Sequence, residues 1–495
     1  MRYTIAISPL LVLGLALPLG CTGDDTSDSS DTNSSTSPTT SPTTSPTSSP
    51  TSSGSDTATG TTETSGTVGE SDGTSTSTTD ATSTSTTDAT STSTTGTTAV
   101  TATDTGTSTT EGTSTSDSDS DSDSTSTTGM QGCIPDQTPS TFDFIWIANT
   151  SQNTVSKINT MTGVEAGRYL VGPGQTNASR TSVNQFGDVV VSSRHEGRVT
   201  KVAALEVRCV DKNNNGMIDT SKDSAFLPWG QDECVLWDTP IPSPSYTHGP
   251  RATAWEAVKQ DEITCEMPVP RVWIGYKDQA NSAHFVRLAG DDGTILDDVV
   301  LENWSNSFSP YGGAVNSEGD FIITGYNNDR VLVIDAETLE ITDLGLPPGG
   351  AKYGMGVQGN GDIWVGSFSG SHNLYHYKWA EKMWVGLGQG GGSILGVAAD
   401  KEGRIWGAGT GPCRLVKADA ETDTYLETNI ALPGCGSPWG VSIDNEGYVW
   451  VVDKQNKAYK VDPDSHNVEL VFDKLVNPYT YSDMTGQGLQ LVLPQ

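Results

Sequence analysis

The chain has few basic residues for its length. Its 495 residues include 27 Lys and Arg against 61 Asp and Glu, which gives a formal net charge of −34. Nucleic acids and anionic lipid headgroups attract proteins through a basic surface. The composition therefore argues against nucleic acid as a partner, and it suits a soluble cell-surface domain or a protein that binds cations.

Motifs for common catalytic chemistries are also missing. The sequence shows no nucleophile elbow, phosphate-binding loop, metalloprotease helix motif or nucleotide-binding fingerprint. Histidine is scarce, and the six residues are His195, His248, His284, His372, His376 and His466. No catalytic group is therefore identified by motif alone.

Apolar stretches long enough to favour a membrane span are absent from the N-terminal region. Residues 2–21 combine a basic start with a short apolar run over residues 5–19, which is typical of an export signal. The sequence Leu-Pro-Leu-Gly-Cys at 17–21 resembles the lipobox of bacterial lipoproteins, although Pro18 replaces the usual Leu. The resemblance implies acylation at Cys21 and a lipid anchor on a bacterial membrane, at the outer membrane or cell surface. The alternative is an ordinary signal peptide that is cleaved nearby.

Residues 22–132 lack basic residues and nearly all large apolar side chains. They consist almost entirely of Ser, Thr, Asp, Gly and Pro in short repeats, with 16 acidic residues. Such a segment cannot bury enough apolar surface to offset its chain entropy, so we expect a disordered linker. Like charges and prolines extend such a chain, and we expect a tether that holds the following domain away from the membrane. Residues 133–495 form the expected folded domain.

Cysteine pairs of the Cys-x-x-Cys type are absent, which argues against a thiolate metal site. If Cys21 carries lipid, the other six cysteines are an even number, as expected in an oxidising, extracytoplasmic compartment. We expect Cys209–Cys234 and Cys413–Cys435 as disulfides, with Cys133–Cys265 by elimination. Six cysteines allow fifteen connectivities, so other pairings stay open.

A repeated phrase in the second half of the chain indicates the fold. It reads Gly-Asp-Ile-Trp364, Gly-Arg-Ile-Trp406 and Gly-Tyr-Val-Trp450, with weaker copies that start at Gly187 and Gly319. The three tryptophans are spaced 42 and 44 residues apart, and this period with strand-like content is the signature of a β-propeller blade. We predict an all-β fold, a β-propeller of seven blades, with six or eight as alternatives.

The predicted blades span residues 144–171, 181–209, 251–301, 311–344, 353–387, 395–430 and 439–472. An insertion at about 205–245 is expected between the second blade and the third. The first blade has no obvious inner strand, and the segment at 478–483 is expected to supply it and close the ring. The tryptophans that share one strand position are expected to pack between blades, and these are Trp146, Trp273, Trp364, Trp406 and Trp450.

The Gly-x-Ile-Trp-Val pattern after a Pro- and Gly-rich inner strand resembles the virginiamycin B lyase-type propellers and the NHL- and YVTN-like propellers. The resemblance covers most of residues 140–495 and concerns the repeat. In the lyases, a metal ion and a catalytic histidine drive ring opening by elimination. None of the six histidines can be placed on that catalytic motif, so the resemblance implies a fold and not an activity.

The insertion contains a motif of the EF-hand calcium type. Residues 211–223 read Asp-Lys-Asn-Asn-Asn-Gly-Met-Ile-Asp-Thr-Ser-Lys-Asp, with oxygen side chains at positions one, three and five and Gly at six. Position twelve is Lys222 where an acid is usual, and no flanking helices are expected. We predict structural Ca²⁺ binding, with a polar turn as the alternative. The candidate ligands are Asp211, Asn213, Asn215, Met217, Asp219 and Asp223.

Aromatic and cationic residues lie just before the predicted inner strands, where they should meet at the mouth of the propeller. Such groups suit an anionic, sugar-like or aromatic ligand. The candidates are Arg180, His248, Arg251, Tyr311, Tyr353, Trp439 and Tyr479. His248 is the one candidate for acid–base work, because histidine titrates near neutral pH. The alternative is a polar lining with no catalytic role.

Two functions follow as hypotheses. The first is a surface-tethered, extracytoplasmic binding or scaffold propeller, with carbohydrate capture as a variant. The second is a metal-dependent lyase or lactone hydrolase that acts at the mouth and clusters His248 with carboxylates.

Overall fold

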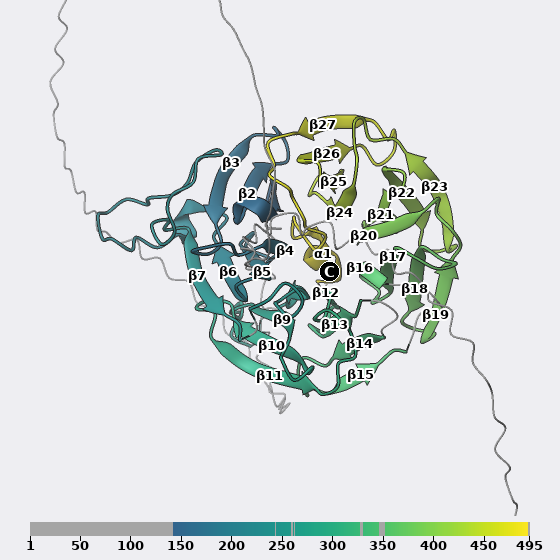
Figure 1. The fold of residues 1–495 in the computed structure, drawn as a ribbon, viewed down its shortest axis with the longest axis horizontal. Helices are drawn as coiled ribbons and strands as arrows, with labels where there is room; N and C mark the ends of the chain where they lie inside the picture. Colours follow the sequence, from purple (N-terminus) through teal and green to yellow (C-terminus); the bar gives the residue numbers. More distant parts are fainter. Residues whose placement is uncertain are drawn as a thin grey trace, which may run out of the picture. The chain divides into compact units, whose positions relative to one another are not determined.

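Seven antiparallel sheets stand around a central axis in the computed structural model (Figure 1). The structure describes residues 142–242, 244–258, 261, 263–326, 330–345 and 352–493. Each sheet is one blade whose strands follow in chain order from the axis to the rim. The predicted all-β, seven-bladed propeller is therefore confirmed. No helix in these ranges is both long enough and apolar enough to cross a membrane.

Blade one has three strands, and blades two and three have four each. Blade one contains β1 (Phe144–Asn149), β2 (Thr154–Asn159) and β3 (Glu165–Leu170), with the 3-10 turn η2 (Thr150–Gln152) after β1. Blade two contains β4 (Ala178–Val183), β5 (Val189–Ser193), β6 (Arg198–Val202) and β7 (Val235–Pro240). Blade three contains β8 (Thr253–Trp255), β9 (Arg271–Lys277), β10 (Ala283–Ala289) and β11 (Ile295–Leu301).

The remaining blades repeat one four-stranded pattern. Blade four contains β12 (Gly312–Val315), β13 (Phe321–Thr324), β14 (Val331–Ile334) and β15 (Ile341–Asp343). Blade five contains β16 (Lys352–Val357), β17 (Ile363–Ser367), β18 (Leu374–Lys378) and β19 (Met383–Leu387). Blade six contains β20 (Ser393–Ala399), β21 (Arg404–Thr410), β22 (Arg414–Asp419) and β23 (Thr424–Ile430). Blade seven contains β24 (Pro438–Ile443), β25 (Val449–Asp453), β26 (Lys457–Val461) and β27 (Val468–Phe472).

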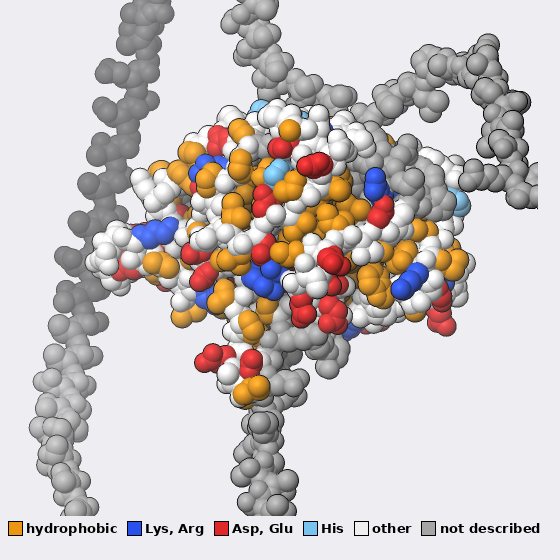
Figure 2. All heavy atoms as spheres, turned by 90° about the horizontal axis from the view of Figure 1, so that it is seen from below, with side chains coloured by type: hydrophobic (Ala, Val, Ile, Leu, Met, Phe, Trp, Pro, Cys, Tyr) orange, Lys and Arg blue, Asp and Glu red, His pale blue; other side chains and the backbone are white. Residues whose placement is uncertain are grey.

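The predicted limits of blade two are wrong. The insertion was expected after this blade, but it lies inside the blade, between β6 and β7, and contains the 3-10 turn η3 (Glu206–Arg208). The outer strand β7 pairs with β6, from Val235 opposite Val202 to Pro240 opposite Arg198. The Cys209–Cys234 disulfide explains how a long excursion fits here, because its Cα atoms lie 4.4 Å apart. The insertion therefore leaves and rejoins the sheet at nearly one point, and it projects from one side of the ring (Figures 1 and 2).

The repeated tryptophans pack between blades as predicted. Trp146, Trp273, Trp364, Trp406 and Trp450 are each at most 1 % exposed. In blade seven the carboxylate of Asp444 caps the turn before the Trp strand, because its Oδ1 accepts the backbone N–H groups of Glu446 and Tyr448. Its Oδ2 accepts the indole N–H of Trp450 at 2.9 Å. Asp400 and Trp406 repeat this arrangement in blade six at 2.8 Å.

The C-terminal segment closes the ring beside blade one. Pro478 forms an isolated antiparallel bridge with Asn149, and the backbone N–H of Trp146 donates to the carbonyl of Met484 at 2.8 Å. The segment therefore lies along the free inner edge of β1, as predicted. It forms a bridge and no regular strand, since side chains supply much of the contact, such as Asn149 Oδ1 accepting the Val476 N–H at 2.8 Å.

A short helix ends the described chain inside the ring. Helix α1 (Gln487–Val492) lies near the axis, at the ends of the inner strands (Figure 1). Leu489 and Val492 are 4 % and 2 % exposed and belong to the same apolar core as β8, β12 and β16. The helix therefore covers one end of the central channel. The opposite end is lined by other residues.

Two of the three expected disulfides are confirmed, Cys209–Cys234 and Cys413–Cys435. Cys265 is disulfide-bonded as well, while Cys133 lies outside the described residues, as do Cys21, the export signal and the linker at 22–132. Disulfides persist in oxidising compartments, so these bridges are typical of an extracytoplasmic protein.

Candidate functional site

Six of the seven predicted mouth residues come together at one end of the channel. All the inner strands run in the same direction along the channel axis. Residues at the beginnings of these strands therefore meet at one end of the channel. Tyr311 directly precedes β12, while Tyr353 and Trp439 are the second residues of β16 and β24. Tyr479 comes from the closing segment, and its ring centre lies 4.8 Å from that of Trp439.

Three tyrosine hydroxyl groups meet at the centre of this arrangement. The hydroxyl of Tyr311 lies 3.3 Å from that of Tyr353 and 3.2 Å from that of Tyr479. The hydroxyls of Tyr353 and Tyr479 are hydrogen-bonded to each other. All three rings are at most 2 % exposed. The residues that carry these groups lie in blades four and five and in the closing segment, so only the closed ring brings them together.

Arginine side chains cover the tyrosine rings. The guanidinium of Arg180 lies 3.1 Å from the centre of the Tyr481 ring and 5.0 Å from that of Tyr311. The guanidinium of Arg251 also lies 5.0 Å from the centre of Tyr311, and Arg194 lies 4.6 Å from that of Tyr479. Cations over aromatic faces gain electrostatic attraction from the ring quadrupole. We call this group the mouth cluster; it consists of Arg180, Arg194, Arg251, Tyr311, Tyr353, Trp439, Tyr479 and Tyr481.

The sequence did not identify Arg194 or Tyr481 as members of the cluster. Arg194 follows β5, a second strand, and reaches the axis because its backbone N–H bonds to the carbonyl of Asn177 at the start of blade two. Tyr481 is two residues after Tyr479, so the two share a side of the extended closing segment. That alternation was the one signal that could have identified Tyr481.

Burial sets the electrostatics of the mouth cluster. Arg180 is 1 % exposed and Arg194 is fully buried. Burial lowers the pKa of Arg180 to about 10, against the opposing effect of the neighbouring Tyr311 and Tyr479. The guanidinium is therefore still charged at neutral pH.

The seventh predicted mouth residue, His248, turns its side chain to Gln279. Its Nδ1 lies 3.0 Å from the side-chain amide nitrogen of Gln279, and burial, followed by the charge of Lys277, lowers its pKa. Histidines do meet carboxylates at His284 and His376, but both belong to third strands, β10 and β18, away from the inner strands. Within the described ranges, no group of three or more His, Cys, Asp or Glu side chains is placed to hold a metal ion.

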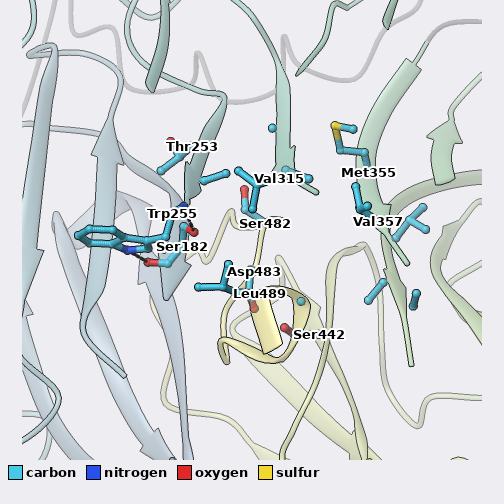
Figure 3. Close-up of a pocket in the computed structure, with 18 of the residues that line it drawn as sticks. Ser182, Thr253, Trp255, Val315, Met355, Val357, Ser442, Ser482, Asp483 and Leu489 are labelled. Atoms are coloured by element: carbon cyan, nitrogen blue, oxygen red, sulfur yellow. Dashed lines mark hydrogen bonds between the residues drawn. The ribbon is translucent and has the colours of Figure 1, made fainter. Parts of the chain in front are cut away.

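The opposite end of the channel contains a small cavity of about 70 Å³ beneath α1 (Figure 3). Its walls are the last residues of the inner strands, such as Val315 and Val357, together with Asp483 and Leu489. The carboxylate of Asp483 accepts the backbone N–H of Gly486 at 2.9 Å. Burial raises the pKa of Asp483, and its backbone hydrogen bonds oppose that rise. Asp483 therefore has a structural role, because these contacts fix the start of α1.

Four of the predicted calcium ligands gather in the insertion. The carboxylate of Asp211 accepts the backbone N–H groups of Asn215 and Gly216 at 3.2 and 2.9 Å. Oδ2 of Asp219 lies 2.8 Å from Nδ2 of Asn213 and 3.0 Å from Nδ2 of Asn215. Gly216 has a φ of +80°, which suits the sharp turn at position six of an EF-type loop.

Two further predicted ligands stand apart from that group. The side chain of Met217 is exposed, and position seven of an EF-type loop offers a backbone carbonyl. Asp223 is exposed, and its carboxylate accepts the backbone N–H of Ala225 at 2.9 Å. The sequence did not identify Glu233, whose buried carboxylate accepts the backbone N–H groups of Asn213 and Asp219 at 3.1 and 2.8 Å. Glu233 therefore stabilises the loop through its backbone N–H groups.

Comparisons with known proteins give similarity of fold. No protein-family model matches the sequence, and no curated protein does. A streptogramin B lyase structure is 16 % identical, covering 63 % of this chain and 87 % of the lyase, with a TM-score of 0.46. Virginiamycin B lyase from Staphylococcus aureus is 14 % identical over 63 % of this chain and 89 % of its own, with a TM-score of 0.45. Apo AztD from Citrobacter koseri is 10 % identical over 68 % and 96 %, with a TM-score of 0.44. The seven-bladed ring itself is shown by the sheet topology, and these similarities carry no activity to this chain.

Proposed function

We propose that this chain is a surface-tethered, extracytoplasmic binding protein whose ligand site is the mouth cluster. The observation that carries the proposal is the burial of three arginines among four tyrosines and a tryptophan at one end of a closed ring. A few polar groups converging in an aromatic setting are the usual make-up of a small-molecule site. Within the described residues, no group of three or more His, Cys, Asp or Glu side chains is placed to hold a metal ion, so we favour binding over metal-dependent catalysis.

The ligand test is a direct binding measurement on the full chain. Trp439 belongs to the cluster, so its fluorescence reports occupancy, and a Trp439→Phe variant identifies the part of the signal that comes from this residue. Saturable binding that is lost in Tyr479→Ala supports the proposal. Turnover of a cyclic lactone depsipeptide or a sugar lactone by the purified chain would contradict it and favour the lyase or lactone hydrolase hypothesis.

The tether is a separate part of the proposal. It rests on the lipobox-like residues before Cys21 and on the linker composition. Mass spectrometry of the chain isolated from bacterial membranes should find a diacylglyceryl group on Cys21, and Cys21→Ala should release the chain from the membrane fraction. Recovery of unmodified Cys21 inside an uncleaved precursor would contradict the anchor.

We further propose that the insertion binds Ca²⁺ in a structural role. Asp211, Asn213, Asn215 and Asp219 converge on one turn, and their oxygens are the ligands that Ca²⁺ prefers. The cation would neutralise two carboxylates and hold the excursion that leaves blade two at the Cys209–Cys234 bridge.

A further inference from the structure

Two buried cations in the mouth cluster lack the partners that other buried cations of this propeller have. Arg168 pairs with Glu165 at 2.8 Å, Arg287 pairs with Asp297 at 2.6 Å, and Lys460 pairs with Glu446 at 2.8 Å. Arg414 has no acid, but it donates to carbonyl groups that include those of Gly390 and Thr428. Across the described chain, burial of a cation is therefore usually matched by acceptors.

Arg180 and Arg194 depart from this pattern. Nη1 of Arg180 donates to the hydroxyl of Ser179 at 2.7 Å, while its Nε and Nη2 have no hydrogen-bond partner among the described residues. Nε of Arg194 donates to Oδ1 of Asn177 at 2.5 Å, while its Nη1 and Nη2 have no such partner in the part of the chain that the structure describes. Both partners, Ser179 and Asn177, are neutral. Leaving a buried charge and its N–H groups without acceptors is costly.

Two more unpartnered polar groups lie in the same cluster. They are the indole Nε1 of Trp439 and the hydroxyl of Tyr481, on side chains that are 4 % and 2 % exposed. The ring centres of these two residues both lie close to Tyr353, at 5.4 and 4.6 Å. Guanidinium and indole nitrogens can only donate, and a hydroxyl can donate as well as accept. A ligand group with several hydrogen-bond acceptors would match these unpartnered donors.

Aromatic rings lie close to both guanidinium groups. Tyr481 lies 3.1 Å from the guanidinium carbon of Arg180, and Tyr246 and Tyr479 lie 4.8 and 4.6 Å from that of Arg194. Stacking holds the flat face of a guanidinium and leaves its edge, where the N–H donors are, for another group. An edge with two parallel N–H groups matches the two oxygens of a carboxylate, sulfate or phosphate.

Resting on the ligand-binding role proposed above, we propose that the mouth cluster binds an oxyanion, held by Arg180 and Arg194 and oriented by Trp439 and Tyr481. The anion supplies the negative charge and the acceptors that these four side chains lack. Carboxylate, sulfate and phosphate share this chemistry. The surrounding rings favour an oxyanion carried on a flat or pyranose ring, which can stack against them.

Matched pairs of probes test the charge directly. Glucuronate is compared with glucose, and benzoate with benzamide, by calorimetry on the full chain, with inorganic sulfate and phosphate as separate arms. We expect the charged member of each pair to bind at least about tenfold more tightly, since charge-assisted hydrogen bonds account for the difference. The sulfate and phosphate arms show whether the anion alone is sufficient or the ring is needed.

Variants test the assigned residues. Arg180→Met and Arg194→Met should each weaken binding of the charged probe roughly tenfold to a hundredfold. Tyr481→Phe, which removes only the hydroxyl, should weaken it less. Arg330→Met removes the same charge from an exposed rim position and should leave binding unchanged. Circular dichroism of each variant confirms that the propeller has folded.

The outcomes separate the two proposals. Equal binding of the charged and neutral members, still lost in Tyr479→Ala, would overturn the oxyanion and leave the binding role standing. Unchanged affinity in folded Arg180→Met and Arg194→Met would overturn the assignment of these residues. No binding by any probe, with ordered water found on the arginines in a crystal structure, would contradict the oxyanion and the ligand role together.

Discussion

The guanidinium of Arg180 lies 3.1 Å from the centre of the Tyr481 ring. One residue belongs to β4 of the second blade and the other to the segment that closes the ring after the seventh blade. The contact therefore exists only when the ring is closed, and it couples the candidate site to completion of the fold.

We expect Arg168→Met to destabilise the protein far more than Arg180→Met. Both arginines are at most 3 % exposed, but Arg168 is paired with Glu165 whereas Arg180 forms no ion pair with a described carboxylate. Removing Arg168 strands a buried carboxylate and should cost about 3–5 kcal/mol. Removing Arg180 relieves an unpaired buried charge, so the variant should lie within about 1 kcal/mol of the wild type or above it. Urea unfolding without ligand measures both, and a large loss in Arg180→Met would show that its role is structural.

The cap at Asp444 should be important for stability. Asp444→Ala removes the acceptors of Trp450, Glu446 and Tyr448 and should lower the free energy of unfolding by about 2–4 kcal/mol. Asp464→Ala is the control, because its side chain is 83 % exposed and should change stability by less than about 0.5 kcal/mol. Equal effects of the two substitutions would contradict the capping role.

Calcium should stabilise the chain through the insertion. Millimolar Ca²⁺ should raise the melting temperature by roughly 2–6 °C, and chelation should reverse the rise, because a ligand that binds only the folded state stabilises it. Asp211→Ala should abolish the shift. Asp223→Ala should retain it, since Asp223 lies outside the gathered oxygens. A calcium shift that survives in Asp211→Ala would place the site elsewhere.

Lys352 should make stability depend on alkaline pH. Burial lowers its pKa from 10.5 to about 8. Between these two values the unfolded chain binds more protons than the folded chain, so this residue makes stability rise with pH across that window. Lys352→Met should therefore stabilise the protein most below pH 8, and the gain should shrink towards pH 10.5. Unfolding curves at pH 7 and pH 10 measure the difference, and a gain that is constant with pH would be inconsistent with the lowered pKa.

Removing the closing segment should prevent folding. A chain that ends at Asn477 loses Tyr479, Tyr481, Met484, Leu489 and Val492, all at most 4 % exposed. At about 1.5–3 kcal/mol for each buried side chain, the loss is comparable with the whole stability of a domain. A chain that ends at Leu493 is the control and should fold. Size-exclusion chromatography and circular dichroism compare the two, and a folded monomer ending at Asn477 would contradict the closure role.

The sequence by itself was sufficient for the ring. The Gly-x-x-Trp repeat recurs because each blade must place a large ring against the next, and this local requirement is visible at a fixed period in the chain. Residues 211–219 could be recognised as one loop for the same reason, since an EF-type turn is built from consecutive residues. The repeat also gave six residues of the mouth cluster, because the starts of inner strands meet wherever a propeller closes.

Tertiary structure decided what the repeat could not encode. The insertion lies inside blade two because β7 pairs with β6 across a long excursion, and strand pairing at that distance leaves no local pattern. His248 was predicted beside Arg251, yet its side chain turns to Gln279, because proximity in the chain does not fix direction. Arg194 and Tyr481 joined the cluster through contacts between distant segments. Whether a buried arginine has an acid beside it depends on every neighbouring segment at once, so the unpartnered donors of the candidate site became visible only in the folded ring.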